Sequence, residues 1–307
     1  MAIEAEAPLR DSGMERTVTN RNPVMSEEGS PNIGELSAES YSRIVAFVTR
    51  ELGIKMPDSK ITMVKCRLGR LARQLGFDSL DRYAEYAFAD NEEREHMVNA
   101  LTTNKTDFFR EPEHFAFLAN EILPSMSSRI AHSRRSFKVW SAGCSSGEEP
   151  FTLAMVLAEY AMLQPGFEFA ILGTDVSTRV LNVARAGVYA ESQVQPVPQH
   201  LRAKYLLRHR NRAEGRVRVV SELRERVTFH QLNFMETDYP VLDTFDVIFF
   251  RNVMIYFDRA IQESVINKLC PHLRRGGYFI VGHSESLFGL DVPLTAVRAS
   301  IYRKRER

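Results

Sequence analysis

Residues 137–163 read FKVWSAGCSSGEEPFTLAMVLAEYAML. An apolar run at 137–142 leads into a turn that contains Gly143 and Gly147, and from Glu149 onward apolar residues recur at helical spacing. The stretch therefore predicts a strand, a tight turn and a helix in direct succession. A strand that passes directly into a helix is the unit from which parallel α/β sheets are built.

The same alternation continues along the chain. Strands are predicted at 167–175, 227–234, 245–252, 276–286 and 297–304, and helices at 177–189 and 258–273. The stretch from about 190 to 226 interrupts this order, because it holds a helix (PQHLRAKYLL) and then a short β-like run (RVRVVSEL). We interpret it as a small inserted subdomain within a domain that spans 137–307.

The N-terminal third has a different pattern. Residues 1–36 are polar and without periodicity, which predicts a disordered tail. From 37 to 120 the periodicity is helical, with Ser40 as the expected cap of the first helix and Asp58-Ser59 as that of the second. The second helix carries one basic face, formed by Arg67, Arg70 and Arg73. A linker is expected at 121–136.

Composition excludes several classes of protein. The chain has 307 residues, 44% of them hydrophobic, with a net charge of +1, so nothing global indicates nucleic acid or an anionic membrane as partner. Three scattered cysteines offer neither a disulfide framework nor a metal quartet, and we expect no metal. No secretion signal or membrane-spanning run is evident. We expect a cytoplasmic monomer that does not insert into the membrane.

Three signals stand where predicted strands end, the place where α/β sheets bind ligands. They are the Gly143–Gly147 turn, Asp175 and Asn252. Each has a plain alternative: any tight connection can use glycine, Asp175 could cap the next helix, and Asn252 could be a buried structural amide. Together they favour a nucleoside-containing cofactor, with Asp175 suited to a ribose diol.

The charge after the glycine turn separates two cofactor classes. Glu148 and Glu149 follow the turn, and a carboxylate there would repel a pyrophosphate. S-adenosylmethionine (SAM) carries a sulfonium and an ammonium instead, which a carboxylate suits. The pair therefore favours SAM, although acids also favour the N-terminus of any helix.

Five blocks of sequence resemble those of the CheR family of chemotaxis receptor methyltransferases. They are LTTNKTDFFREPEHF (101–115), VWSAGCSSGEEPFTLAM (139–155), LGTDVSTRVLNVARAGVY (172–189), FFRNVMIYFD (249–258) and GGYFIVGHSESL (276–287). The resemblance runs in order from Tyr41 to Tyr302. It implies an α/β, Rossmann-like SAM-dependent methyltransferase domain with a small inserted antiparallel β-subdomain, preceded by an all-α N-terminal domain.

The resemblance also implies site residues. Cofactor contacts carry over to Asn104, Thr106, Arg110, Glu148, Asp175, Asn233, Phe234, Asn252 and Val253. It implies that Asp175 holds the ribose hydroxyls and that Asn233 and Phe234 flank the adenine. Arg110 and Tyr256 lie in the motifs nearest the reacting methyl group and are the expected catalytic residues.

The implied reaction transfers a methyl group from SAM to glutamate carboxylates of chemotaxis receptors, leaving S-adenosylhomocysteine and a methyl ester for sensory adaptation. A glutamate with a pKa of about 4.3 is already ionised at neutral pH, so no general base is required. We therefore expect Arg110 to orient the carboxylate or the methionine end of SAM, and Tyr256 to position the substrate. Cys144 and His283 are expected to support the pocket without covalent catalysis.

The partner expected from the resemblance is the acidic methylation region of a receptor's cytoplasmic helical bundle. Arg67, Arg70 and Arg73 would read that surface, and no acid between 60 and 75 neutralises them. The inserted subdomain could add a strand from a receptor C-terminal peptide. Alternatives are a SAM methyltransferase for another substrate, a SAM-sensing adaptor and a nicotinamide-dependent oxidoreductase, the last disfavoured by Glu148 and by the missing G-x-G-x-x-G turn.

Overall fold

The computed structural model describes residues 33–126, 135–209 and 214–305. Most of the tail predicted at 1–36, and residues 127–134 of the linker predicted at 121–136, lie outside these residues. Where they are described, Leu36 is buried in the helical core, Gly34 N donates to Asp78 O at 2.9 Å, and residues 123–126 are α-helical. Among the described residues, no helix is long and apolar enough to cross a membrane.

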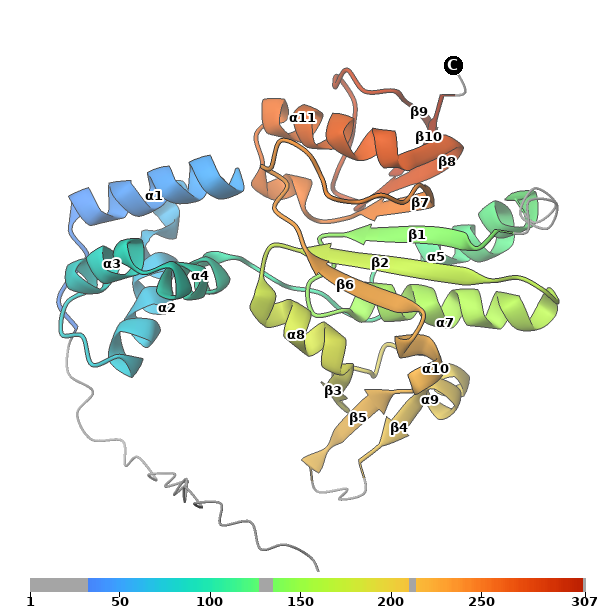
Figure 1. The fold of residues 1–307 in the computed structure, drawn as a ribbon, viewed down its shortest axis with the longest axis horizontal. Coiled ribbons are helices and arrows are strands. Elements are labelled where there is room, and N and C mark those ends of the chain that lie inside the picture. The colour runs from blue at the N-terminus through green and yellow to red at the C-terminus, as the bar shows by residue number, and fades with distance from the viewer. Residues whose placement is uncertain (1–32, 127–134, 210–213, 306–307) are drawn as a thin grey trace, which may run out of the picture. The chain divides into compact units, whose positions relative to one another are not determined.

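A seven-stranded sheet organises the C-terminal two thirds (Figure 1). Its order is β6 (Val227–Gln231), β2 (Phe169–Asp175), β1 (Phe137–Ala142), β7 (Phe245–Phe250), β8 (Leu273–Val281), β10 (Ile301–Lys304) and β9 (Leu294–Arg298). The first five strands are parallel to their neighbours, and the last two add an antiparallel edge. The chain proceeds from β1 to β2 and β6 on one side and to β7 and β8 on the other, so strand order reverses beside β1.

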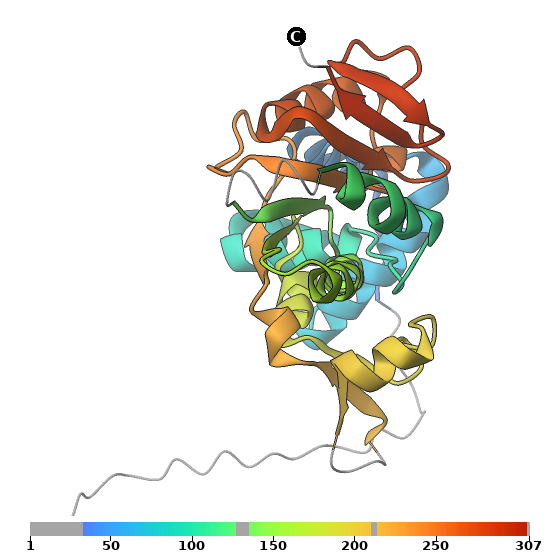
Figure 2. The ribbon, with the colours of Figure 1, turned by 90° about the vertical axis from the view of Figure 1, so that its right-hand side faces the viewer.

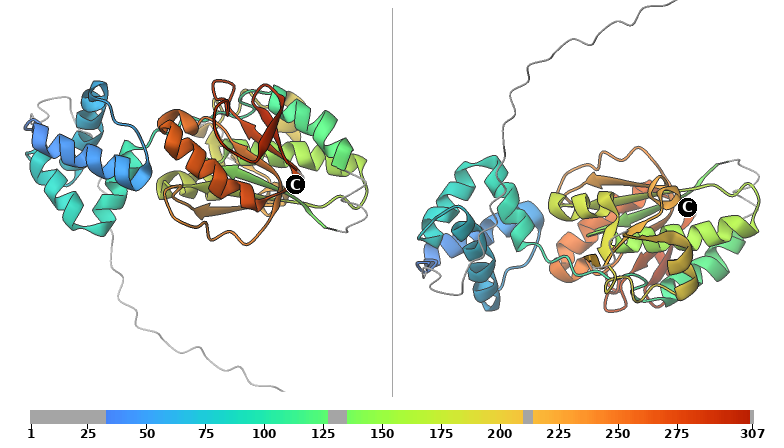
Figure 3. Two further views of the ribbon diagram at one scale, coloured as in Figure 1. Left: turned by 90° about the horizontal axis from the view of Figure 1, so that it is seen from above. Right: turned by 90° about the horizontal axis from the view of Figure 1, so that it is seen from below.

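Helices cover both faces of this sheet. They are α7 (Glu148–Leu163), α8 (Thr178–Ala186) and α11 (Arg259–Leu269). Val139 of β1 packs in the same cluster as Leu153 of α7, whereas Trp140 packs with Ile266 of α11. Successive residues of a strand face opposite sides, so α7 and α11 cover opposite faces. Figure 3 shows α11 in front of the sheet from above, and α7 and α8 from below.

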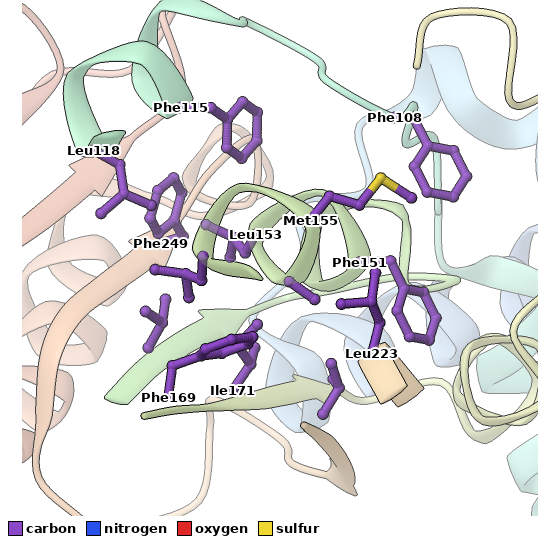
Figure 4. Packing of buried hydrophobic residues seen from close by; sticks show 14 of the residues in the cluster. Phe108, Phe115, Leu118, Phe151, Leu153, Met155, Phe169, Ile171, Leu223 and Phe249 are labelled. Carbon is purple, nitrogen blue, oxygen red and sulfur yellow. The ribbon is translucent and has the colours of Figure 1, made fainter. Parts of the chain in front are cut away.

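The core between α7 and the sheet is aromatic and aliphatic. Figure 4 shows Leu153 of α7 near Phe249 of β7, with Phe169 and Ile171 of β2 below the helix, whereas Met155 points to the other side of the helix, toward Phe108. All six side chains are at most 5% exposed. This packing fixes the height of α7 on the sheet, and with it the turn that connects β1 to α7.

The predicted insertion forms a separate three-stranded antiparallel sheet (Figure 2). It comprises β3 (Val188–Ala190), α9 (Gln199–Tyr205), β4 (Leu206–Arg208) and β5 (Arg216–Val219), with β5 between the other two strands. A short helix, α10 (Ser221–Arg224), leads back to β6. The predicted Rossmann-like fold with an inserted antiparallel sheet is thereby confirmed.

The N-terminal part is all-helical, as predicted. Its elements are α1 (Ala38–Leu52), a 3₁₀ turn η1 (Asp58–Lys60), α2 (Ile61–Gln74), α3 (Leu80–Ala89) and α4 (Asn91–Leu101). Ser37, not Ser40, caps α1, since its side chain accepts from Ser40 N at 3.1 Å. Asp58 and Ser59 begin the 3₁₀ turn without a side-chain cap, and α2 starts at Ile61. Both cap predictions were wrong because propensity cannot place a helix start to within three residues.

Residues 103–107, which follow α4, form neither helix nor strand. The chain then turns into α5 (Glu113–Phe117), continued by a π-helical turn η2 (Leu118–Ile122). With no ladder of backbone hydrogen bonds of its own, this irregular segment is held by contacts from neighbouring elements.

Candidate active site

A cavity of about 310 Å³ opens where β1, β2 and β7 end. Its lining combines the turn after β1 (Gly143 to Ser145), the end of β2 (Asp175, Val176) and the residues after β7 (Arg251 to Val253) with the irregular segment after α4. The volume lies within the range of small-molecule sites. The site thus stands at the point of strand reversal, where doubly wound sheets bind their ligands.

The turn after β1 requires glycine at its first position. Gly143 has φ +83°, and a Cβ placed there would lie 2.5 Å from Val253 Cγ2. The backbone at Gly143 therefore approaches the chain after β7 more closely than any other residue would allow. This close approach brings two of the three predicted ligand-binding signals together.

Asp175 is held at the cavity wall by backbone amides. Its Oδ2 accepts from Ser145 N at 2.9 Å and its Oδ1 from Ser177 N at 3.0 Å. The side chain that caps α8 is Ser177, which accepts from Val180 N, so Asp175 is not the capping residue. Burial raises the pKa of Asp175, and the backbone hydrogen bonds oppose that rise. Two backbone amides therefore hold this carboxylate in a fixed orientation on a residue that lines the cavity.

The two glutamates after the turn have different surroundings. Glu148 is 2% exposed, accepts from Ser146 Oγ at 2.7 Å and does not line the cavity. Burial raises its pKa. Glu149 does line the cavity, and it binds Ser141 Oγ at 2.7 Å and Arg251 Nη1 at 2.8 Å. Of the two glutamates, the cavity lining therefore includes Glu149 and not Glu148, the residue that the resemblance implies as a cofactor contact.

Arg251 connects two carboxylates beneath the cavity. Its Nη2 lies 3.0 Å from Glu111 Oε2, and its Nη1 bonds Glu149. Burial would raise the pKa of Glu111, but Arg251, Asn252 and the amide of His283 together lower it. Glu111 is consequently ionised near neutral pH and compensates the buried guanidinium.

The same carboxylate determines how Asn252 is oriented. Asn252 Nδ2 donates to Glu111 Oε1 at 3.2 Å. A carboxylate only accepts, so the amide must present its NH₂ to Glu111. The carbonyl oxygen is then the remaining acceptor of a residue that lines the cavity. A Cβ at Gly282 would lie 2.4 Å from Asn252 Nδ2, so glycine is required behind this amide.

Residues 104–110, which begin in the irregular segment after α4, supply Asn104, Thr106 and Arg110 to the cavity lining. Ser145 Oγ donates to Asn104 O at 3.0 Å, which ties the segment to the turn after β1. Arg110 Nη1 donates to Lys105 O at 3.0 Å within the same segment. Three of the predicted residues thus depend on a single stretch of chain.

Asn233, Phe234 and Tyr256 complete the predicted lining. The Asn233 side chain donates to Glu51 O at 2.7 Å and accepts from Met235 N at 3.0 Å, so it joins α1 to the sheet. Phe234 packs edge-on to Phe250 at 5.2 Å between centroids. Burial raises the pKa of Tyr256, a rise that the charges of Arg110 and Arg67 oppose.

The structure also adds lining residues that the sequence did not predict. Leu52, Ile54, Met56, Lys60 and Met63 reach the cavity from the end of α1 to the start of α2. Their spacing resembles that of ordinary helix and loop residues, so the sequence pattern could not identify them as cavity-lining residues. They give one wall an apolar surface with a single ammonium group.

Cys144 and His283 do not form a nucleophilic pair. Cys144 is buried, and burial together with Asp175 and Glu149 raises the pKa of its thiol well above the usual range.

Glu111, His114 and His283 place atoms of the kind that bind metals within 4.8 Å of one another. Both Glu111 oxygens, however, already bind Arg251 and Asn252, and the guanidinium disfavours a metal cation beside it.

Arg67, Arg70 and Arg73 of the predicted basic face differ in exposure. Arg70 and Arg73 are exposed, whereas Arg67 is partly buried and its guanidinium donates to carbonyl oxygens at the end of α4. The structure therefore separates Arg67 from the two outer arginines.

Comparison with known proteins supports one family over nearly the whole described chain. Residues 39–102 match the CheR methyltransferase all-alpha domain, and residues 104–302 match the CheR methyltransferase SAM-binding domain. Residues of both matches line the cavity, and the second match identifies the cofactor of the chain as SAM.

Several curated relatives match this chain over most of its length. The chemotaxis protein methyltransferase of Salmonella typhimurium is 39% identical over 83% of this chain and 86% of its own length. Those of Borreliella burgdorferi and Escherichia coli are each 36% identical, covering 88% and 87% of this chain and 95% and 91% of their own. The chain belongs to the CheR family of chemotaxis protein methyltransferases.

Proposed function

We propose that the protein transfers the methyl group of SAM to glutamate side-chain carboxylates of chemotaxis receptors and forms glutamate methyl esters. The observation that carries this proposal is the composition of the cavity. Asp175, a carboxylate suited to ribose hydroxyls, stands at one strand end, and the cations Lys60 and Arg110 line the same cavity near Tyr256. Cations at the reacting end suit an anionic acceptor such as a carboxylate.

The reaction is a direct displacement. The carboxylate oxygen forms a bond to the methyl carbon while the sulfur–methyl bond breaks, so the sulfonium becomes a neutral thioether and no proton is transferred. The protein contributes alignment and exclusion of water, because the nucleophile is already ionised. Arg110 is the proposed orienting residue, and Tyr256 the proposed contact that positions the glutamate.

We also propose roles for the residues around the cofactor. We assign Asp175 to the ribose hydroxyls, Phe234 and Asn233 to the adenine side, and Asn104, Thr106 and Val253 to the remaining wall. Glu149 takes the place of Glu148, since it lines the cavity. The carbonyl oxygen of Asn252, oriented by Glu111, is a suitable acceptor for the ammonium group of the methionine moiety.

Receptor recognition is proposed for two surfaces. Arg70 and Arg73 are exposed on α2 and suited to an acidic helical bundle. In the inserted sheet, β3 and β4 are the edge strands, and either can accept a peptide strand from a receptor tail. Both contacts would operate in the cytoplasm on receptors that are themselves anchored in the membrane.

The decisive experiment is transfer of radiolabelled methyl from SAM to receptor-containing membranes, followed by mild base. Label released as methanol identifies a carboxyl ester, and its loss in Arg110→Ala places Arg110 in the reaction. Base-stable label would identify another acceptor group. No label from a protein that binds S-adenosylhomocysteine would reject the receptor assignment.

A further inference from the structure

We infer that Arg67 is a positioning residue for the cofactor cavity, acting through the backbone at the end of α4. The inference rests on the proposed placement of the cofactor in that cavity. Its basis is the set of hydrogen bonds that the Arg67 guanidinium makes. Nη1 lies 3.1 Å from Ala100 O, 3.1 Å from Leu101 O and 2.9 Å from Thr102 O.

These bonds complete the end of a helix. The last four carbonyl groups of a helix have no intrahelical partner. At the end of α4, Val98 O accepts from Thr102 N and Asn99 O from Thr102 Oγ1. Ala100 O and Leu101 O then remain, and the two N–H groups of Arg67 Nη1 are shared among these oxygens and Thr102 O. A cation at this end is also favoured by the helix dipole.

The chain that leaves this helix end is the one that lines the cavity. Residues 103–107 form neither helix nor strand, and Asn104, Thr106 and Arg110 all follow within eight residues of Thr102. Arg67 Nη2 also lies 3.4 Å from Thr103 Oγ1. Arg67 therefore fixes where this segment starts, while the Ser145 hydroxyl holds it further on at Asn104 O.

The neighbours of Arg67 on the same helix provide the contrast. Arg70 and Arg73 are exposed, and within the described residues neither has a recorded hydrogen bond or ion pair. Their charges are available to a partner. The Arg67 guanidinium is hydrogen-bonded to the protein's own backbone. Its charge also acts to lower the pKa of Tyr256, although burial raises that pKa by more.

The test compares Arg67→Ala with Arg70→Ala in the full-length protein. Titration calorimetry with S-adenosylhomocysteine, in the absence of receptor, should show a Kd raised roughly tenfold in Arg67→Ala, because charge-assisted hydrogen bonds are lost. The Kd of Arg70→Ala should be unchanged. Steady-state kinetics should then show a raised KM for SAM only in Arg67→Ala, and a raised KM for receptor in Arg70→Ala.

Hydrogen exchange distinguishes a local from a global effect. Amides of residues 103–110 should exchange faster in Arg67→Ala, with exchange in α3 unchanged. A Kd for S-adenosylhomocysteine equal to that of wild type would overturn the inference and leave Arg67 as a receptor contact. If the alanine variant fails to fold, Arg67→Lys, which keeps the charge, is measured in the same way. Failure of the wild type to bind would instead reject the proposed site.

Discussion

Asn252 Nδ2 donates to Glu111 Oε1 at 3.2 Å, joining residues that are 141 positions apart. Glu111 follows the irregular segment after α4, and Asn252 follows β7. The bond connects the two halves of the cavity lining and decides which atom of the amide is left to a ligand.

Glu111→Gln should weaken S-adenosylhomocysteine binding about tenfold. A glutamine no longer dictates the orientation of Asn252, and it leaves Glu149 as the remaining carboxylate partner of Arg251. Calorimetry measures the effect. Glu113→Gln, whose carboxylate is exposed two residues away, is the matched control and should bind as wild type. Equal affinities in both variants would contradict the orienting role of Glu111.

Gly143→Ala should destabilise the fold more than Gly166→Ala. Both glycines have φ near +82°, so both substitutions incur about 1–2 kcal/mol for the left-handed conformation. Only at Gly143 does the new Cβ meet Val253, at 2.5 Å, whereas Gly166 has open space. Overpacking adds about 1–3 kcal/mol to the loss of unfolding free energy. Urea denaturation gives the difference, and Val253→Ala should restore part of it.

Asp175→Asn should lower the affinity for S-adenosylhomocysteine by roughly 10- to 100-fold. The amide NH₂ cannot accept from Ser145 N or Ser177 N, so one of the two backbone bonds is lost together with an anionic acceptor. Asp243→Asn, at an exposed carboxylate paired with Lys138, is the control. Unchanged binding in Asp175→Asn would exclude the ribose assignment.

Acidification should destabilise the protein through His114. Burial, Arg251 and His283 lower the pKa of His114 to about 4, from 6.5 in the unfolded chain. The unfolded state therefore binds more protons between these values, and stability falls as pH falls through that window. The contribution of His114 alone is about 2 kcal/mol between pH 7 and pH 5. Between pH 7 and pH 5, the free energy of unfolding measured in urea should therefore fall by about 2 kcal/mol more in wild type than in His114→Gln. Parallel pH profiles of the two proteins would contradict this prediction.

Receptor methylation should depend on salt through α2. If Arg70 and Arg73 read an acidic surface, raising ionic strength should raise the KM for receptor while the Kd for S-adenosylhomocysteine stays constant. Arg70→Ala combined with Arg73→Ala should flatten that dependence. Arg82→Ala, an exposed arginine on α3 paired with Asp78, should not. An equal salt dependence in all three proteins would place the receptor contact elsewhere.

Several site residues could be located from the sequence because the rule that places them is local. Asp175 and Asn252 close apolar strands, and the ends of parallel strands that flank the strand-order reversal meet at one edge of the sheet. The choice between Glu148 and Glu149 could not be made in this way. Adjacent helical residues point about 100° apart, and only the packing of α7 decides which faces the cavity.

Arg67 shows the limit most clearly. Helical spacing places it on one basic face with Arg70 and Arg73. The sequence by itself determined this placement and the order of strands and helices. Whether a face meets solvent or another helix depends on contacts between distant segments, which no local pattern encodes. Only the tertiary structure placed the end of α4 against Arg67 and Glu111 against Asn252, because these contacts form when separately folded elements pack together.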